Sequence, residues 1–380
     1  VTGKPDLIQA RLDEVRGILE SNSEVFRRLR RARGLPRTDW GIRIRTPAIN
    51  TLLPSLPGQR QLSKLLSLST SYHHAIGDDK AAVELMRDAL ALGNAVGQMP
   101  GWVPIYVAMA TDGVIFQSIE AISSTLNIKP ANSFVQLTGN PCKRDDTEAL
   151  LRNLLNEQAH HEAIKHALFF ERMSQLDIVR WMANRPPGTS SAWGAAPPPS
   201  STPWPVLWGY VITPLVELDG ARMIRDRHLR LQAAAESDWV RAKRALQKEP
   251  TQYDTLRRIV HFLSVTWDSS LERSFLLHFR SLASRRLAGT AVAVRLYQVD
   301  HGHRPSTLVE LVPEYLPEVP LDPFAGDGSA IRYLPKARPA LLYSIGPDGV
   351  DDGGRYTFRS GGIDWYILDI PFFLDGNRPT

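Results

Sequence analysis

Residues 343–354 read Tyr-Ser-Ile-Gly-Pro-Asp-Gly-Val-Asp-Asp-Gly-Gly and lie between two strand-like runs. Asp348, Asp351 and Asp352 fall within five positions, and glycines are interleaved with them. Carboxylate oxygens on a backbone that turns sharply are typical ligands of a hard cation such as calcium. A solvated hairpin turn is the alternative, because Asp-Gly is a common turn dipeptide. The stretch therefore predicts a calcium-binding loop or a tight turn between strands.

The region around this stretch has the pattern of a small α+β domain. A helical pattern over 285–300 is followed, after Pro305, by short strand-like runs at 331–334, 340–344 and 363–370 with turn residues between them. Such a change from helical to strand periodicity is typical of a domain boundary. We therefore predict an α+β domain over residues 285–380.

The preceding residues have the periodicity of helices. Apolar residues recur at three- and four-residue spacings over 6–33, 60–97, 101–126 and 146–183, and two further helical stretches cover about 208–283. Residues 75–85 resemble the turn of a tetratricopeptide repeat, but one good copy is too few for a repeat array. The fold class we predict is mainly α, made of helical hairpins in an irregular α-solenoid-like arrangement.

The helical part is interrupted by a proline-rich segment. Residues 185–205 hold prolines among Gly, Ser and Ala, with Trp193 and Trp204 between them. Proline excludes both a helix and an inner strand here. We predict a linker or a strap over 185–205, separating a helical domain at 1–184 from a helical region at 206–284.

Composition limits the class of protein. The chain has 380 residues, 43% of them hydrophobic, and a formal net charge of +5. The basic run Arg27–Arg33 is typical of a solvated helix face, with contact to nucleic acid or anionic lipid as the alternative, and we expect no nucleic-acid partner. The single cysteine, Cys142, excludes an internal disulfide framework and a multi-cysteine zinc site.

The sequence starts at Val1, and no apolar run approaches the roughly 20 residues of a membrane helix. We expect a leader or membrane anchor to precede Val1, with lost disordered residues or a cloning boundary as alternatives. The expected location is the cell envelope, periplasmic or extracytoplasmic and close to a membrane.

The C-terminal domain resembles the soluble part of the major pseudopilin of type II secretion. The matching residues are Leu296-Tyr297, Asp300-His301-Gly302, Pro305, Tyr315-Leu316-Pro317, Pro320–Phe324, Tyr333, Tyr343–Gly349 and Gly353-Gly354. The resemblance implies a pseudopilin-like fold with a structural calcium ion. It assigns Asp348 as a ligand directly and Asp364 only loosely, while Asp351 and Asp352 come from the spacing within this chain.

Two features depart from that family. Arg304 stands where the family usually has an aromatic residue, and helical sequence replaces the long apolar N-terminal helix of a filament subunit. An ordinary filament subunit is therefore not expected. The whole layout also resembles uncharacterised envelope proteins of planctomycete-type bacteria, which brings no known activity.

The helical half has one group of residues that could carry metal or acid–base chemistry. Glu157 and His160 have the Glu-x-x-His spacing of di-iron bundles, and His161, Glu162 and His166 follow closely. The His-Glu-x-x-His zinc spacing is missed by one residue, and a di-iron site needs a second Glu-x-x-His with two more carboxylates. A polar helix face is therefore the favoured interpretation.

These observations favour a non-catalytic scaffold or protein-interaction subunit of the cell envelope, with a calcium-stabilised C-terminal domain and other proteins as partners. One alternative is a metal-assisted hydrolase that uses His160, His161 or Glu162. The other is an accessory subunit of a larger membrane or secretion complex. A deep cleft of carboxylates and imidazoles would favour the enzyme, and a flat apolar patch would favour the scaffold.

Overall fold

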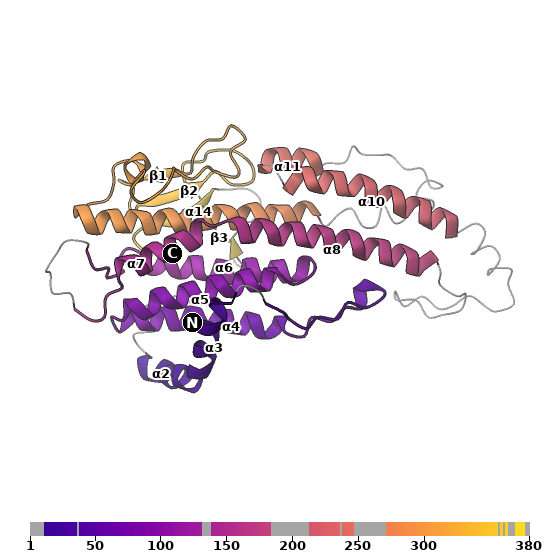
Figure 1. The fold of residues 1–380 in the computed structure, drawn as a ribbon. Coiled ribbons are helices and arrows are strands. Elements are labelled where there is room, and N and C mark those ends of the chain that lie inside the picture. The colour runs from indigo at the N-terminus through magenta and orange to yellow at the C-terminus, as the bar shows by residue number, and fades with distance from the viewer. Residues whose placement is uncertain are drawn as a thin grey trace.

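The computed structural model describes residues 11–35, 38–130, 138–183, 213–235, 238–246, 271–355, 358–359, 362–363 and 369–376. This part of the chain is a long bundle of helices with a small antiparallel sheet against one helix (Figure 1). The predicted fold class, mainly α with a small C-terminal sheet, is confirmed at this level. The strap at 185–205 and Asp364 lie outside the described residues.

The helices follow one another along the bundle, and the described ones have these bounds: α2 Leu12–Ser21, α3 Ser23–Arg33, α4 Leu56–Ala75, α5 Asp79–Gly97, α6 Trp102–Ile122, α7 Arg144–Leu155, α8 Gln158–Ala183, α10 Thr213–Ala235, α11 Trp239–Leu246 and α14 Leu271–His301. Two short 3₁₀ helices, η1 and η3, cover Ala48–Asn50 and Leu308–Leu311.

The hairpin predicted over 60–97 forms from α4 and α5. Gly77 turns the chain at φ +78°, which glycine adopts without a steric penalty. Asp78 then accepts a hydrogen bond from the Ala81 backbone N–H at 3.2 Å and caps α5. Buried Asp79 accepts a hydrogen bond from the Asn127 backbone N–H at 2.8 Å, which ties the start of α5 to the segment after α6.

Helix α6 lies in the middle of the bundle. The expectation that no apolar run approaches the length of a membrane helix was wrong here, because α6 is long and apolar enough to span a membrane by length and composition alone; 61% of its most apolar window is buried. A buried core helix passes the same test. The buried residues Ile105, Ile115 and Ile119 of α6 belong to the main hydrophobic cluster.

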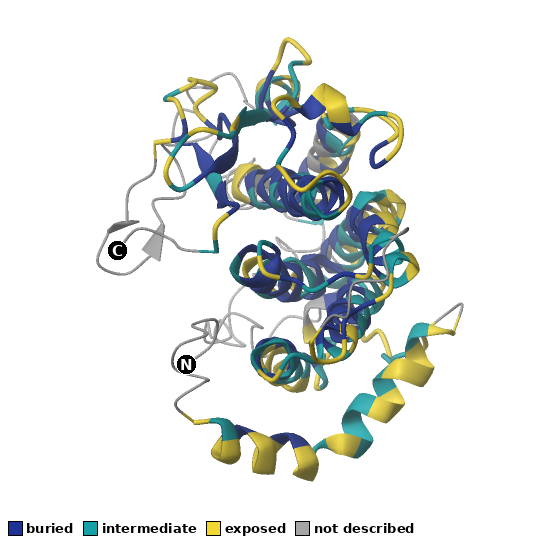
Figure 2. Cartoon of the chain, turned by 90° about the vertical axis from the view of Figure 1, so that its left-hand side faces the viewer, coloured by how far each residue is buried: buried dark blue, intermediate teal, exposed yellow. Residues whose placement is uncertain are grey.

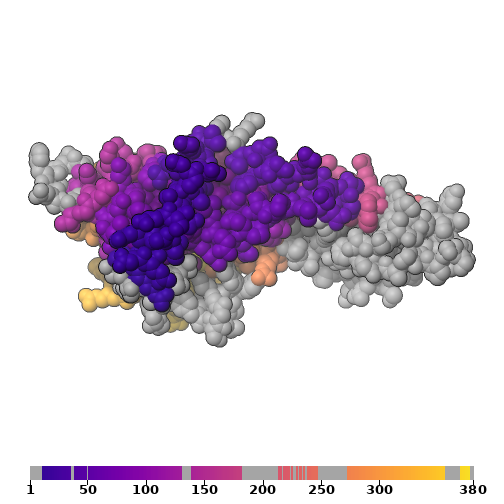
Figure 3. Space-filling model, turned by 90° about the horizontal axis from the view of Figure 1, so that it is seen from below, coloured from indigo at the N-terminus to yellow at the C-terminus, as the bar shows by residue number. Residues whose placement is uncertain are grey.

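The N-terminal helices lie across the outside of the bundle (Figures 2 and 3). Arg30 donates to Asp88 of α5 at 2.7 Å, and Arg33 donates to Glu84 of α5 at 2.7 Å. Arg27 and Arg28 pair instead with Glu24 on their own helix. Much of the charge of the basic run is therefore paired within the chain.

The small sheet has the order β1–β2–β5, with all neighbours antiparallel; β1 is Arg332–Leu334, β2 is Leu341–Ser344 and β5 is Ile370–Phe373. Leu342 lies opposite Tyr333 on one side and Phe372 on the other. A second pair joins β3 (Phe358–Arg359) to β4 (Gly362–Ile363). The strands predicted at 331–334 and 340–344 are confirmed.

Helix α14 joins the bundle to the sheet. It is continuous from Leu271 to His301, so the domain boundary predicted near residue 284 falls inside it. One hydrophobic cluster contains Ile115 of α6, Leu287 of α14 and Leu342 of β2. Phe373 of β5 donates its backbone N–H to the buried Glu120 of α6 at 2.9 Å. The helices and the sheet therefore share a core.

Candidate functional site

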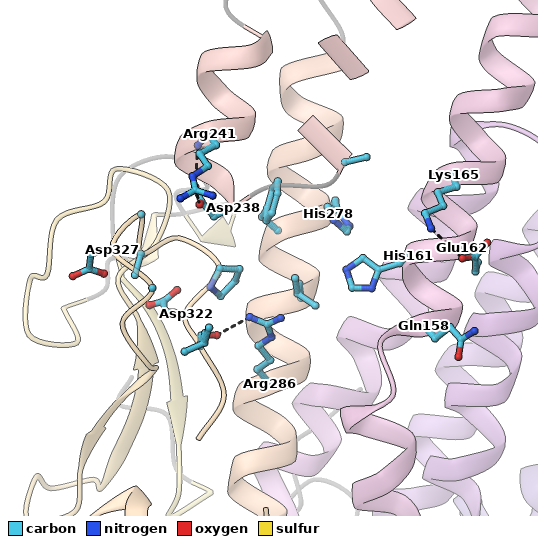
Figure 4. Close-up of a pocket in the computed structure, with 18 residues that line it drawn as sticks. Gln158, His161, Glu162, Lys165, Asp238, Arg241, His278, Arg286, Asp322 and Asp327 are labelled. Atoms are coloured by element: carbon cyan, nitrogen blue, oxygen red, sulfur yellow. Dashed lines mark hydrogen bonds and ion pairs between the residues drawn. The ribbon is translucent and has the colours of Figure 1, made fainter. Parts of the chain in front are cut away.

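A cleft of about 750 Å³ lies between α8, α11, α14 and the loop before β1 (Figure 4). This volume is in the range of small-molecule sites. Its described lining residues are Gln158, His161, Glu162, Lys165, Ala235, Asp238, Arg241, His278, Phe279, Leu282, Arg286, Leu321, Asp322, Pro323, Ala325, Gly326, Asp327 and Gly328. The sequence predicted His161 and Glu162 as candidates for metal or acid–base chemistry. Both lie on α8, in the wall of the cleft that this helix forms.

Two histidines face each other across the gap between α8 and α14, His161 from α8 and His278 from α14 (Figure 4). Their ring centroids are 6.1 Å apart. Behind them, His160 Nε2 lies 2.8 Å from His278 Nδ1, with the two rings nearly parallel at 13°. His278 is 1% exposed and His160 is 9% exposed. The imidazole pair is therefore built into the wall of the cleft.

Both imidazoles of the pair are neutral near pH 7. Burial, with the nearby His161 and Arg286, lowers the pKa of His278 to about 3. Burial also lowers the pKa of His160 well below its ordinary value, together with His278 and Arg285. One ring nitrogen of this contact donates and the other accepts, so the two neutral rings are either both protonated at Nε2, with His160 as the donor, or both protonated at Nδ1, with His278 as the donor. His278 consequently presents either an N–H or a lone pair at Nε2.

Most charged side chains of the cleft already have partners. Lys165 pairs with Glu162 at 3.3 Å on α8, and Arg241 pairs with Asp238 at 3.3 Å. Arg286 donates to Glu157 at 2.7 Å and to the Leu321 carbonyl at 2.7 Å. The bonds of Arg286 hold α14, the start of α8 and the loop before β1 in one arrangement, whereas the other two pairs are local to α8 and to the start of α11. Glu157, which the sequence offered as a di-iron ligand, is thus a partner of Arg286.

The floor of the cleft is connected to the acidic stretch. Asp322 is 2% exposed and accepts hydrogen bonds from Ser344 Oγ at 2.7 Å and the Ile345 backbone N–H at 2.8 Å. Trp239 of α11 donates its indole N–H to the Pro347 carbonyl at 2.9 Å. The Asp-Pro-Phe and Tyr-Ser-x-Gly motifs of the sequence therefore meet in one polar junction.

In the acidic stretch, two of the predicted calcium ligands make separate local contacts. Asp348 accepts a hydrogen bond from the Val350 backbone N–H at 3.1 Å. Asp351 accepts from the Tyr343 hydroxyl and the Gly353 N–H, both at 3.0 Å, and pairs with Arg332 at 3.1 Å. Within the described residues, no group of three or more His, Cys, Asp or Glu is arranged to hold a metal ion.

Asp369 is a carboxylate that the sequence interpretation missed. It is 3% exposed, and its Oδ2 accepts a hydrogen bond from the Gly354 N–H at 2.7 Å. Burial, with the charges of Asp351 and Asp352, raises its pKa to about 6, and its Oδ1 has no hydrogen-bond partner among the described residues. An unsatisfied buried oxygen suits a hard cation. The second of the two aspartates inside the largely apolar run 363–373 was the available signal.

Other histidines and the cysteine of the described residues lie apart from the cleft. His301 stacks on Tyr297, with ring centroids 4.0 Å apart, and the His303 imidazole lies 2.9 Å from the Arg304 carbonyl. Cys142 is buried, and burial raises the pKa of its thiol to about 11, which keeps it protonated and unreactive at neutral pH. His166 is exposed on α8 and does not line the cleft.

The chain was compared with protein-family models, with curated proteins and with solved structures, and none of these comparisons gave a match. The pseudopilin resemblance therefore stays a prediction that depends on the motif residues.

Proposed function

We propose that this chain is a non-catalytic binding or scaffold subunit of the cell envelope, whose partner contacts the cleft between α8, α11 and α14. The observation that carries the proposal is the pairing of Lys165, Arg241 and Arg286 with carboxylates of the same chain. Catalytic groups act on a bound substrate, whereas these charges are already paired within the chain, and Arg286 also holds two walls of the cleft together through Glu157 and the Leu321 carbonyl. A preformed cleft of this kind suits recognition.

The envelope location and a role in a larger membrane complex are supported by the pseudopilin resemblance of residues 285–380. A metal-assisted hydrolase remains the alternative. His160 is hydrogen-bonded to His278 and Glu162 is paired with Lys165, so two of its three candidate residues already have partners.

The first test changes the cleft without changing the core. Leu321 lines the cleft and is 51% exposed, so Leu321→Glu is expected to fold normally. The charge should weaken partner binding at least about tenfold, a loss of about 1.4 kcal/mol. The measurement is quantitative mass spectrometry of proteins retained from native membranes by the wild-type and variant chains.

The matched control is Val309→Glu, because Val309 is 70% exposed and lies outside the cleft. A binding partner should be retained by the wild type and by Val309→Glu and lost from Leu321→Glu. Identical retention by all three chains would contradict the assignment of the cleft. If purified chain instead hydrolysed ester or phosphoester substrates, and Leu321→Glu blocked this activity, the enzyme alternative would replace the proposal.

We propose further that calcium binds the acidic stretch and stabilises the C-terminal region. The supporting observations are the clustering of Asp348, Asp351 and Asp352 in sequence and the unsatisfied oxygen of Asp369. The described carboxylates are held by local hydrogen bonds and by Arg332, so binding has to draw them together. The ion would screen their mutual repulsion and would have a structural role.

The test is thermal unfolding of the full chain in calcium and then in chelator. Calcium at 100 times its dissociation constant should stabilise the folded chain by about 2.7 kcal/mol. Asp348→Asn should weaken this response, and Asp348→Ala or Asp369→Asn should remove most of it. Asp327→Asn is the control, since Asp327 bonds only Ser329 among the described residues and lies outside the stretch. If the midpoint of thermal unfolding did not change up to millimolar calcium, the calcium proposal would be wrong and the loop would be an ordinary turn.

A further inference from the structure

The hydrogen bond between His160 and His278 joins two helices that have little other direct contact. Helix α8 packs mainly on α10 and α5, whereas α14 packs mainly on α6, α7 and α11. The imidazole pair, at 2.8 Å, and the ion pair from Arg286 to Glu157, at 2.7 Å, bridge them beside the cleft. A small change at the pair can therefore separate this wall without disrupting either helix's main packing.

The groups that face the pair disfavour a positive charge on it. Arg285 and His161 lie close enough to oppose protonation of His160, and Arg286 and His161 do the same for His278. The charges of Arg285 and Arg286 are each offset by one carboxylate, Asp112 of α6 and Glu157 respectively. The other charged groups around this cleft are Glu162, Lys165, Asp238, Arg241, Asp322 and Asp327. Among the described residues, no carboxylate is hydrogen-bonded to either imidazole of the pair.

We propose that the buried pair of His160 and His278 is an acid-sensitive latch, which holds the start of α8 against α14 at neutral pH and opens this wall of the cleft when it is protonated. The inference depends on the geometry of the pair and not on the identity of any partner. The cleft would then be closed at neutral pH and open at acidic pH.

The direction of the effect follows from proton linkage. The folded-state pKa values of both imidazoles are lowered, whereas in the open state water restores them to about 6.5. The closed state is therefore fully favoured above pH 6.5 and is lost progressively as the pH falls below it. With two imidazoles, the equilibrium for opening should rise about 30-fold between pH 6.5 and pH 5.5.

The test is hydrogen exchange of the full chain followed by mass spectrometry, with rates corrected for the intrinsic pH dependence of exchange. Peptides covering 158–165 and 275–282 should lose protection as the pH falls from 6.5 to 5.5, while peptides of α4 and α5 should keep it. Loss of protection throughout the chain at the same pH would show global unfolding and would overturn the latch.

A matched variant removes the titratable imidazoles of the pair but keeps a hydrogen bond between the two positions. Glutamine places an amide near Nε2 of His160 and asparagine places one near Nδ1 of His278, so the double variant His160→Gln/His278→Asn can pair without a titratable group. Its protection over 158–165 should not change between pH 6.5 and 5.5. His166→Gln, at the exposed histidine of the same helix, should respond to acid like the wild type. An unchanged acid response in the double variant would overturn the proposal.

Discussion

Replacing Asp112 with alanine is expected to lower the free energy of unfolding by about 3–5 kcal/mol, because it leaves Arg285 as an uncompensated buried charge. Arg285 Nη2 donates to Asp112 Oδ2 at 3.0 Å, and the two side chains are 1% and 5% exposed. Burial raises the pKa of Asp112 even though Arg285 opposes this change. The carboxylate thus depends on its partner to stay charged.

Arg285→Ala should be at least as damaging, because Arg285 also completes the end of α7. Its Nη1 donates to the carbonyl of Asn153 at 3.0 Å and lies 3.5 Å and 3.4 Å from those of Leu154 and Asn156. The last carbonyls of a helix have no partner within the helix and need one from elsewhere. One guanidinium therefore connects α6, α7 and α14.

Urea unfolding monitored by circular dichroism measures both effects. Arg28→Ala is the control, since the Arg28–Glu24 pair is 78% and 45% exposed and should contribute under about 1 kcal/mol. The double variant Asp112→Leu/Arg285→Met should be more stable than either single alanine variant, because it removes both buried charges. A cost below about 1 kcal/mol for Asp112→Ala would mean that water reaches this pair.

Local sequence signals predicted the helices well but not all of their ends. The pattern over 6–33 predicted one helix, and the structure has a break at Asn22. Ser21 Oγ and Asn22 Nδ2 donate to the carbonyls of Gly17 and Ile18, each at 2.8 Å. Such side chains compete with the helix for backbone groups, which explains the break. The signal was present in the Ser-Asn-Ser sequence.

The run over 146–183 shows a limit of local reasoning. It was predicted as one helix, whereas α7 ends at Leu155 and α8 begins at Gln158. Asn156 caps the new start by accepting the Gln158 N–H at 3.1 Å, and this could have been anticipated. The end of α7 also depends on Arg285, about 130 residues away in sequence. Helical periodicity does not show which distant side chain will satisfy a helix end.

The cleft was predictable only in part, for the same reason. His160, His161 and Glu162 were singled out because they are neighbours in sequence. His278, which completes the imidazole pair, is 118 residues from His160 and lies in a stretch with no recognisable motif. Asp369 is 15 residues from Gly354, to which it bonds, and no local motif predicts this contact. Only the packing of α14 against the bundle and the sheet brings these groups together.

Replacing Trp239 with alanine is expected to cost about 3–5 kcal/mol, in the range for removing a large buried aromatic side chain. Trp239 is 4% exposed, and its ring makes edge contacts with Phe279 and Phe324 at centroid distances of 6.0 Å and 6.1 Å. Its indole N–H also donates to the Pro347 carbonyl at 2.9 Å. Thermal and urea unfolding of the full chain give the measurement.

Trp239→Phe separates packing from hydrogen bonding, because phenylalanine keeps an aromatic ring but leaves the Pro347 carbonyl without its donor. We expect this variant to cost about 1–3 kcal/mol, less than alanine. Lys243→Ala is the control, since Lys243 lies 5.9 Å from the centroid of the same ring and a contact of this kind contributes about 0.5–1 kcal/mol when exposed. If Trp239→Ala cost no more than this control, α11 would not be anchored through Trp239. The connection between the floor of the cleft and the acidic stretch would then depend on the hydrogen bonds of Asp322 to Ser344 and Ile345, and calcium could not affect the cleft through Trp239.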